Sequence, residues 1–566
     1  MPYDVVIRNG TVVDGSGLAP YPADVGIVGD RIARIGRIRE PGAREIDAEG
    51  LAVTPGFVDG HTHMDAQVFW DERGSYSCYH GVTTVVMGHC GFTLAPSPPE
   101  QRALVVRNLE RAEDISGSAM AAGIDWTWTT FAEYLDAVDR RPKAINYVAN
   151  IGHSALRTYA MGERAFDGEA TADDLDLMAR ELRDALRAGA YGFTTSRTRQ
   201  HETSDNRPVA SRLASWDEVR ALVGVMGDLG GGVFQLVEDR HEAPDGGAEM
   251  SRRLVELAVD TGVTVAIPAA GSDTRVLDLL DRAAAAGARM FGLSHCRGIG
   301  NMSSFRTRLP FDGLPEWREL RARGLDEQRR LLEDPAVRER LVKVAADGDY
   351  GRAIGAEARK PDYERMRVVD APLPPNPTVA EVARDRGIDP VEAIIDLSIE
   401  SDFERFFVQT IAPFDPDGVR TVMKHPRTVM AFSDAGAHVS QMSDCSIYTH
   451  LLSHWVRDRG DFTFEEAVRM ITFEPARAWN LADRGLVREG MIADLNVLDP
   501  AVVAPEMPRV VHDLPAGERR IEQLASGFAA TLVGGQVTLA GGEETGARPG
   551  RLLRGPLAAG ATRTQP

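Results

Sequence analysis

Apolar and polar positions alternate with a period of two near both ends of the chain. The N-terminal segments "DVVIRNGTVVDGSG", "ADVGIVGDRIARIG" and "REIDAEGLAVTPG" place short runs of valine and isoleucine between Asn-Gly, Gly-Asp and Glu-Gly turns. This pattern is typical of short antiparallel strands. The same alternation of apolar and polar residues returns in "ADLNVLDP" and "FAATLVGGQVTLAGG". We therefore predict a small β-sandwich domain built from residues 1–53 and 485–545, with a larger domain inserted between them.

The pattern changes in residues 54–484, where short β-branched runs alternate with longer alanine- and arginine-rich stretches of helical character, such as 171–188 and 216–229. Parallel sheets built from βα units produce this alternation. The candidate strands, in order, are "GFVDGHTH", "VTTVVMGHCG", "INYVANIGHS", "AYGFTTSRT", "GVFQLVED", "TVAIPAAG", "RMFGLSHCRG" and "TVMAFSDAGAH". Eight strands is the number in a TIM barrel, so we predict an α/β fold with a (β/α)8 TIM-like barrel.

Two segments do not fit the βα pattern. Residues 297–390 are longer than a βα connection needs, and they contain the charged stretch "LDEQRRLLEDPAVRERLVKVAADG" and the proline-rich "APLPPNP". We predict that they form a lid-like insertion over the barrel mouth. Residues 546–566 have little apolar material, so we predict a flexible tail.

Composition limits the class of protein. With 43% hydrophobic and 26% charged residues, the 566-residue chain has the composition of a soluble globular protein. It has no apolar run of about 18 residues that could span a membrane, and Asp4 interrupts any secretory signal, so we expect a cytoplasmic protein. The net charge of −20 argues against nucleic acid or membrane as a partner. The four scattered cysteines predict reduced thiols, and homo-oligomerisation stays open.

The first candidate strand carries the clearest chemical signal. His61 and His63 lie two residues apart in "GHTHMD", so both side chains face the same way if the strand continues through them. Two imidazoles side by side at a barrel mouth suit zinc or a similar divalent metal. The alternative is a polar turn after a core strand. The apolar "TPGFVDG" that precedes the histidines favours the metal site.

Three motifs, "PGFVDGHTHMD", "GVTTVVMGHCGFT" and "FSDAGAH", follow in order on candidate strands one, two and eight. Through them the chain resembles the amidohydrolase superfamily over nearly its whole length, and within it the D-aminoacylase or N-acyl-D-amino-acid deacylase branch. The resemblance implies a metal-dependent hydrolase of a C–N amide bond. The implied partner is a small-molecule amide, most simply an N-acyl-D-amino acid or related linear amide. A cyclic amide, such as a hydantoin, and a non-catalytic small-molecule binder on the same fold are the alternatives.

The resemblance also implies the metal ligands. His61 and His63 would bind metal from strand one, and Asp434 would bind metal and take a proton from the attacking water. No lysine ends a candidate strand, so Cys90 would bridge two ions in place of a modified lysine. The expected cofactor is one or two divalent ions, with Zn²⁺ first. Alternatives are a helix N-cap for Asp434 and a buried small hydrophobe for Cys90.

Strands five and six depart from the family pattern, because "VFQLVED" and "VAIPAAG" contain no histidine. The site is then mononuclear, or it takes replacement ligands, for which His295 in "LSHCRG" and His153 in "IGHS" are the candidates, or it has lost its metal. His89 should face away from the metal. His438, four residues after Asp434, would either orient that carboxylate or lie at the surface.

Substrate recognition has weaker signals. Ser196 and Arg197 in "TTSRTR" could form a carboxylate-binding fork at the end of strand four, and Arg157 in "GHSALR" is a second candidate. The alternative for both arginines is an ordinary surface position. We expect the polar stretches "HETSD" from His201 and "RHE" from Arg240 to be solvated loops.

Overall fold

Both ends of the chain contribute to one nine-stranded sheet. The computed structural model describes residues 3–239, 245–411, 414–442 and 444–558. Strand β18 pairs antiparallel with β5, and this pairing joins the C-terminal strands to the N-terminal ones. A separate apolar core that includes Val5, Ile27 and Leu532 lies against the sheet. Its strand order is β25 (Glu543–Glu544), β24 (Gln536–Ala540), β23 (Phe528–Val533), β18 (Leu495–Leu498), β5 (Ala52–Pro55), β1 (Tyr3–Val12), β2 (Tyr21–Val28) and β3 (Arg31–Gly36), with β4 (Gly42–Asp47) paired to β1.

The segment between β18 and β23, which we call the excursion, leaves this sheet. We had predicted that all of residues 485–545 belong to the β domain. It forms two small antiparallel pairs, β19 (Ala504–Pro505) with β22 (Ala525–Ser526) and β20 (Arg509–Val511) with β21 (Arg520–Glu522). The N–H of Ile521 donates to the carbonyl of Val439 at 2.8 Å, and the Arg520 guanidinium lies 4.4 Å from the centroid of the Tyr76 ring. These contacts hold the excursion against the larger domain.

The larger domain contains parallel strands that pair in chain order. Val58, Val86, Val148 and Val233, from four of these strands, belong to one buried apolar cluster. A parallel bridge between Thr62 and Ala435 links the first strand's end to the last. The strands are β6 (Phe57–Asp59), β7 (Val82–Met87), β8 (Asn146–Ala149) continued by β9 (Ile151–Gly152), β10 (Gly192–Ser196), β11 (Val233–Val237), β12 (Thr264–Pro268), β13 (Met290–Ser294) and β17 (Thr428–Met430).

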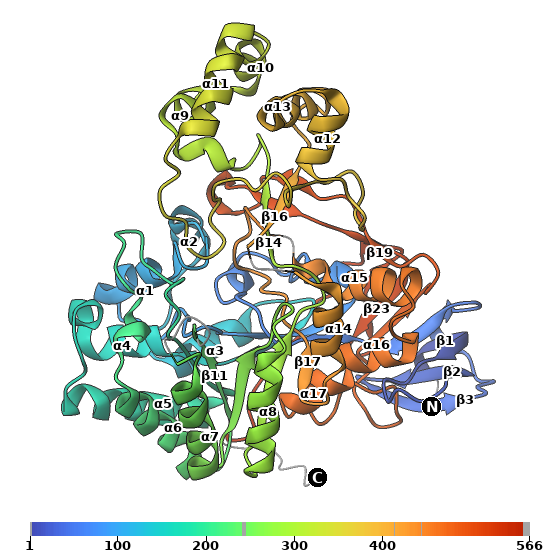
Figure 1. The fold of residues 1–566 in the computed structure, drawn as a ribbon. Helices are drawn as coiled ribbons and strands as arrows, with labels where there is room; N and C mark the ends of the chain where they lie inside the picture. The colour runs from blue at the N-terminus through green and yellow to red at the C-terminus, as the bar shows by residue number, and fades with distance from the viewer. Residues whose placement is uncertain (1–2, 240–244, 412–413, 443, 559–566) are drawn as a thin grey trace.

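Helices connect these strands and surround them (Figure 1). Thr171 caps α5 in a capping box with Asp174, and the helix ends at Gly189, as start and stop signals predict. None of the helices in the described part of the chain is both long and apolar enough to cross a membrane. The helices of this domain are α1 (Arg102–Leu109), α2 (Gly117–Gly123), α3 (Phe131–Arg140), α4 (His153–Met161), α5 (Ala172–Ala188), α6 (Trp216–Leu229), α7 (Ala248–Thr261), α8 (Arg275–Ala285), α14 (Pro416–Lys424), α15 (Ile447–His450), α16 (Phe464–Ile471) and α17 (Phe473–Ala478).

The insertion between β13 and α14 forms a lobe of its own, seen at the top of Figure 1. The lobe has a separate apolar core around Trp317 and Phe311. It extends beyond the predicted limit of residue 390, because Ile395 of α13 and Phe407 of β16 are buried in that same core. Its elements are β14 (Gly300–Ser303), α9 (Pro315–Arg321), α10 (Leu325–Leu332), α11 (Pro335–Asp347), β15 (Arg367–Val368), α12 (Val379–Arg386), α13 (Pro390–Glu400) and β16 (Phe407–Thr410).

The C-terminal segment is docked through residue 558, in contrast to the flexible tail that we predicted for residues 546–566. Strand β26 (Leu552–Leu553) pairs in parallel with β8, and the N–H of Gly555 donates to the carbonyl of Gly189 at 2.8 Å. The backbone groups along this edge of β8 would otherwise lack partners, which explains the docking of a segment with few apolar residues. Residues 559–566 lie outside the described residues.

Candidate metal centre

The ends of β6 and β17 bring His61, His63 and Asp434 together. The N–H of Asp434 donates to the carbonyl of His61 at 3.0 Å, and the N–H of His63 donates to the carbonyl of Ala435 at 2.8 Å. The chain between the two histidines is therefore extended, and both rings lie on the same side, as their spacing predicts.

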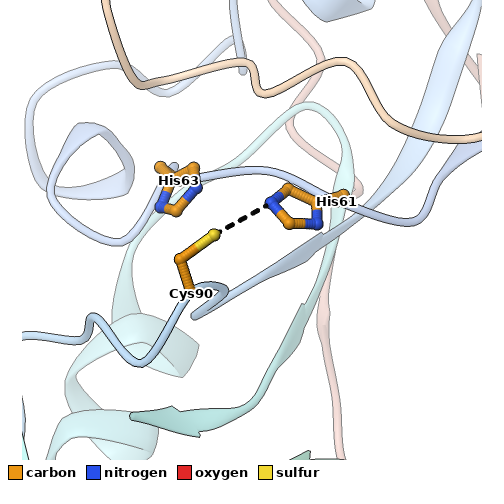
Figure 2. Close-up of side chains that lie close together, drawn as sticks. All are labelled: His61, His63 and Cys90. Atoms are coloured by element: carbon orange, nitrogen blue, oxygen red, sulfur yellow. Dashed lines mark hydrogen bonds between the residues drawn. The ribbon is translucent and has the colours of Figure 1, made fainter. Parts of the chain in front are cut away.

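The atoms of these side chains are spaced like ligands of one ion. His61 Nε2 lies 3.5 Å from Cys90 Sγ and 3.4 Å from Asp434 Oδ1, and His63 Nε2 lies 3.1 Å from the same Asp434 oxygen. Figure 2 shows the two rings and the Cys90 thiol gathered at one point. Ligand atoms around a tetrahedral zinc with bonds of about 2.0–2.3 Å are about 3.3–3.8 Å apart. The donor set fits a divalent metal, and the spacings of 3.4 and 3.5 Å fall within this range while that of 3.1 Å is slightly shorter.

Two further side chains join this group, and sequence analysis did not select them. A carboxylate oxygen of Glu113, the Cys90 sulfur and a ring nitrogen of His201 all lie within 4.8 Å of one another. Glu113 Oε2 is also 3.6 Å from His63 Nε2. Glu113 lies in a polar loop after α1 that carries no motif. His201 was expected to be solvated, but its ring faces the other donors. We call the six residues the donor cluster: His61, His63, Cys90, Glu113, His201 and Asp434.

Several atoms of the donor cluster lack hydrogen-bond partners although they are buried. The exposed fractions of His61, His63 and Glu113 are 0%, 2% and 1%. Both ring nitrogens of His63, Oε1 of Glu113 and Oδ1 of Asp434 have no hydrogen bond. Buried polar atoms nearly always find a partner. Convergent unpaired donors of this kind are what a bound cation would satisfy.

The pKa values of Cys90, Glu113, His61 and Asp434 lead to the same conclusion. Burial lowers the pKa of His63, but Glu113 and Asp434 outweigh it and raise that pKa well above its ordinary value, so a metal would displace the ring proton. Burial raises the pKa of the Cys90 thiol to about 12 and that of Glu113 to about 8, and it lowers the pKa of His61 to about 4. Burial also disfavours the Asp434 anion, but the adjacent His61 and His63 imidazoles hold its pKa well below the ordinary range. The thiol therefore keeps its proton unless a cation replaces it, while the His61 imidazole is already neutral and able to coordinate.

Backbone strain is concentrated in this region. Cys90, Asp434 and His438 have φ angles of 55°, 59° and 51°, a conformation that costs about 1–3 kcal/mol for residues other than glycine. His438 Nε2 lies 3.7 Å from Glu113 Oε2 and 3.9 Å from Asp434 Oδ2. His438 is thus beside both carboxylates, the position that the orienting interpretation predicted.

His153 and Arg157 belong to a different cluster. Nδ1 of His153 lies 2.8 Å from the Thr195 hydroxyl, and its Nε2 lies 2.9 Å from Glu218 Oε1. Arg157 donates to the same Glu218 oxygen at 2.6 Å. We call these three residues, His153, Arg157 and Glu218, the Glu218 cluster. Because both ring nitrogens of His153 are occupied, the structure separates it from the donor cluster, and the buried Arg157 pairs with Glu218.

His295 and His89 also lie outside the donor cluster. Nδ1 of His295 is 2.7 Å from the carbonyl of Arg297, and its Nε2 is 3.4 Å from Asp444 Oδ2. Among the described residues, the groups of side chains that could hold a metal do not include His295. His89 stacks on His61 with a centroid distance of 4.0 Å, so it packs against a candidate ligand.

The candidate substrate residues have other partners. The hydroxyl of Ser196 lies 2.8 Å from Nδ1 of His201, and Arg197 donates to the carbonyl of Ala214 at 2.7 Å. The "RHE" stretch at 240–242 lies outside the described residues. On strand five, Gln235 accepts a hydrogen bond from the Cys90 N–H at 2.9 Å. A glutamine that positions Cys90 thus occupies the strand on which the resemblance led us to expect a histidine.

Comparison with known proteins decides the family. The profile of the amidohydrolase family matches residues 44–251 and 317–539, which is more than half of the chain. The chain belongs to the amidohydrolase family. It is therefore a hydrolase of carbon–nitrogen bonds, as the motifs predicted.

Individual relatives agree over the full length of this amidohydrolase. It is 27% identical to the D-aminoacylase of Alcaligenes xylosoxydans xylosoxydans over 568 residues, covering 98% of both chains. It is 29% identical to the N-acyl-D-glutamate deacylase of the same organism over 569 residues, covering 97% of this chain and 96% of the relative. The solved N-acyl-D-glutamate deacylase of Bordetella bronchiseptica, complexed with zinc and a phosphonate inhibitor, shares the fold with a TM-score of 0.64 at 24% identity, covering 98% of this chain and 100% of that one. The prediction of a D-aminoacylase-like branch is confirmed.

Proposed function

We propose that this amidohydrolase is a metal-dependent deacylase of N-acyl-D-amino acids and that His61, His63, Cys90 and Asp434 hold its catalytic metal. The observation that carries the proposal is the convergence of these donors at 3.1–3.5 Å around unpaired, buried atoms. The names of the full-length relatives support the substrate class. We further infer that the parallel strands close into a (β/α)8 barrel and that the nine-stranded sheet is the family's β-sandwich.

Each of the chain's own groups has a task in amide hydrolysis. A divalent ion such as Zn²⁺ supplies a lowered water pKa and polarises the amide carbonyl. Asp434 stays ionised because His61 and His63 stabilise its carboxylate, so it can accept the proton of the attacking water and deliver it to the leaving nitrogen. His438, within 3.9 Å of Asp434 Oδ2, orients that carboxylate.

A small cavity of about 30 Å³ lies beside this carboxylate. Its lining includes Asp434, Ser433, Tyr76 and Arg520. The excursion between β18 and β23 therefore contributes to the surroundings of the site, although it belongs in sequence to the β domain.

Hydrolysis of a defined panel tests the proposal. Zinc-loaded protein is mixed with N-acetyl-D-glutamate, N-acetyl-D-aspartate, N-acetyl-D-methionine, their L-enantiomers and a hydantoin, and the released amine or ring-opened product is measured. We expect cleavage of at least one D-substrate, loss of cleavage in Asp434→Asn, and retention in Asp281→Asn, whose side chain is 61% exposed. Absence of cleavage of every D-substrate overturns the proposal, and cleavage of the hydantoin alone would assign a cyclic amide hydrolase.

A further inference from the structure

We propose that Arg212 binds the α-carboxylate of the substrate and thereby makes the enzyme prefer N-acyl amino acids to neutral amides. The inference rests on the proposed function, because it names the group that holds one end of that substrate. The arginines selected from the sequence do not meet this need. Arg157 is paired with Glu218. Arg197 lies two residues after Thr195, so its side chain is on the face of β10 that serves the Glu218 cluster.

Arg212 lies within one residue's length of the donor cluster. It belongs to the short 3₁₀ helix Ala210–Leu213, which follows the loop after β10. Its Nη1 donates to the backbone carbonyl of His201 at 2.8 Å, and the ring of the same histidine is grouped with Cys90 and Glu113. Burial lowers the pKa of the His201 imidazole, and the Arg212 charge adds to that shift, as a nearby cation does. The guanidinium is therefore at the rim of the candidate metal centre.

Most of the hydrogen-bonding capacity of Arg212 is unused. A guanidinium has five N–H donors. Among the described residues, the acceptor that Arg212 bonds is the His201 carbonyl. Its ion-pair partner Glu202 lies 3.9 Å away, beyond hydrogen-bonding distance, and Oε1 of Glu202 already accepts from Arg352 of the lobe at 2.6 Å. Arg212 thus retains donors for a ligand although its side chain is only 15% exposed.

The ion pairs around Glu202 contain more positive than negative charge. Three arginines face this carboxylate, namely Arg352 at 2.6 Å, Arg111 at 3.8 Å and Arg212 at 3.9 Å. In the described part of the chain, the other carboxylate that pairs with them is Glu357, which lies 2.7 Å from Arg111. Burial lowers the pKa of Arg212 although Glu202 opposes the shift, so the buried charge is not fully compensated. A bound carboxylate would supply the missing negative charge.

The chemistry of the substrate brings its carboxylate close to such a cation. In an N-acyl amino acid only the amide nitrogen and Cα separate the scissile carbonyl carbon from the carboxylate carbon, so these two carbons lie about 3–4 Å apart. A scissile carbonyl held at the donor cluster therefore brings the carboxylate towards the rim where Arg212 lies. The planar fork of a guanidinium matches the two oxygens of a carboxylate and fixes its direction as well as its position. A hydantoin or a primary amide has no carboxylate to bind there.

Paired substrates test the inference. The N-acetyl-D-amino acid that the zinc-loaded wild type cleaves best is compared with its α-carboxamide, and acetate release is measured for both. We expect the wild type to favour the carboxylate by about 10- to 100-fold in kcat/KM, which is the effect of one charge-assisted pair. In Arg212→Gln this preference should vanish through a raised KM for the carboxylate, while kcat/KM for the carboxamide stays within about threefold of the wild type. Arg212→Lys should keep part of the preference, and Arg220→Gln, whose side chain is 56% exposed, should keep all of it.

A binding measurement gives a second readout that does not depend on turnover. Calorimetry on zinc-loaded Asp434→Asn should show that adding Arg212→Gln raises the dissociation constant of the same N-acetyl-D-amino acid about tenfold or more.

A wild type without a preference for the carboxylate, or Arg212→Gln proteins that keep both the preference and the affinity, overturns the inference. An equal loss for carboxylate and carboxamide also overturns it, because that result shows a structural role. Loss of the preference in Arg197→Gln but not in Arg212→Gln overturns it and assigns the carboxylate to Arg197. A wild type that cleaves no N-acyl-D-amino acid overturns the proposed function itself.

Discussion

The donor cluster and the Glu218 cluster both bury histidine beside carboxylate at the ends of the parallel strands. They differ in how many of their buried polar atoms are hydrogen-bonded. In the Glu218 cluster, His153 uses both ring nitrogens, and Arg157 compensates the charge of Glu218 at 2.5 Å. In the donor cluster, His63 and Glu113 contain buried atoms without any hydrogen bond.

The difference separates a structural ion pair from a binding site. Buried polar atoms that satisfy one another stabilise the fold and have no capacity left for a ligand. Buried atoms that remain unpaired together are costly, and a ligand can repay that cost. One strand supports both clusters: adjacent residues of β10 face opposite ways, so Thr195 bonds His153 while Ser196 bonds His201. The following changes should therefore affect one cluster and leave the other intact.

The largest expected effect is on catalysis, from Asp434→Asn. The amide keeps the size of the side chain but cannot accept the proton of the attacking water, so kcat/KM for the cleaved substrate should fall by about 10⁴-fold. The unfolding midpoint in urea should stay close to that of the wild type, because Asp434 is not part of a satisfied structural pair. Residual activity above a tenth of the wild type would remove Asp434 from the proton-transfer role.

The next largest effect is on stability, from Glu218→Gln. Loss of the carboxylate leaves the Arg157 charge buried without compensation, which should lower the free energy of unfolding by about 3–5 kcal/mol. Zinc content should not change, because neither Glu218 nor Arg157 contacts the donor cluster. Urea unfolding and elemental analysis measure both quantities, with Glu110→Gln as the exposed control. A variant that keeps its stability and loses zinc would contradict the separation of the two clusters.

The ion pair of Glu218 and Arg157 predicts that stability depends on pH. Burial opposes ionisation of Glu218, but His153 and Arg157 outweigh it and lower the pKa of the carboxyl to about 2. In the unfolded chain a glutamate takes up its proton near pH 4.3, at about its ordinary pKa. The stabilisation from Glu218 is therefore fully present above about pH 4.3 and is lost as the pH falls towards 2.

The difference in free energy of unfolding between the wild type and Glu218→Gln measures the stabilisation from the Glu218 charge, since other carboxylates titrate equally in both proteins. It should be constant from pH 7 to 5 and shrink steadily between about pH 4.3 and 2. Urea unfolding at a series of pH values measures it. An unchanged difference down to pH 2.5 would show that the Glu218 charge does not stabilise the fold.

The site residues that follow strands could be predicted from the sequence. His61, His63, Cys90 and Asp434 directly follow β6, β7 and β17, and parallel strands deliver the residues at their C-terminal ends to a common face. The apolar alternation at the chain termini likewise predicted a sheet shared by both ends. In each case the periodicity of a strand fixes direction and register without knowledge of packing.

Features that depend on contacts between distant parts of the chain could not be predicted in this way. Glu113 reaches the site because its carbonyl accepts a hydrogen bond from the N–H of His438, which lies more than 300 residues later in the chain. His153 starts α4 directly after β9, so its ring turns towards α6 and not into the mouth. The docked tail depends on an unpaired edge of β8, which the composition of residues 546–558 does not reveal. All three are set by tertiary contacts, which local sequence patterns do not encode.

The smallest expected effects, from Ser196→Ala and Thr195→Val, compare the clusters most closely. Ser196→Ala removes the hydroxyl that orients His201, so it should weaken zinc binding about 10- to 100-fold while stability is nearly unchanged. Thr195→Val removes the hydroxyl that bonds His153, so it should lower the free energy of unfolding by about 1 kcal/mol and leave zinc binding intact. Zinc titration and urea unfolding of both variants measure the contrast. If Thr195→Val weakened zinc binding as much as Ser196→Ala did, the two faces of β10 would not serve separate clusters.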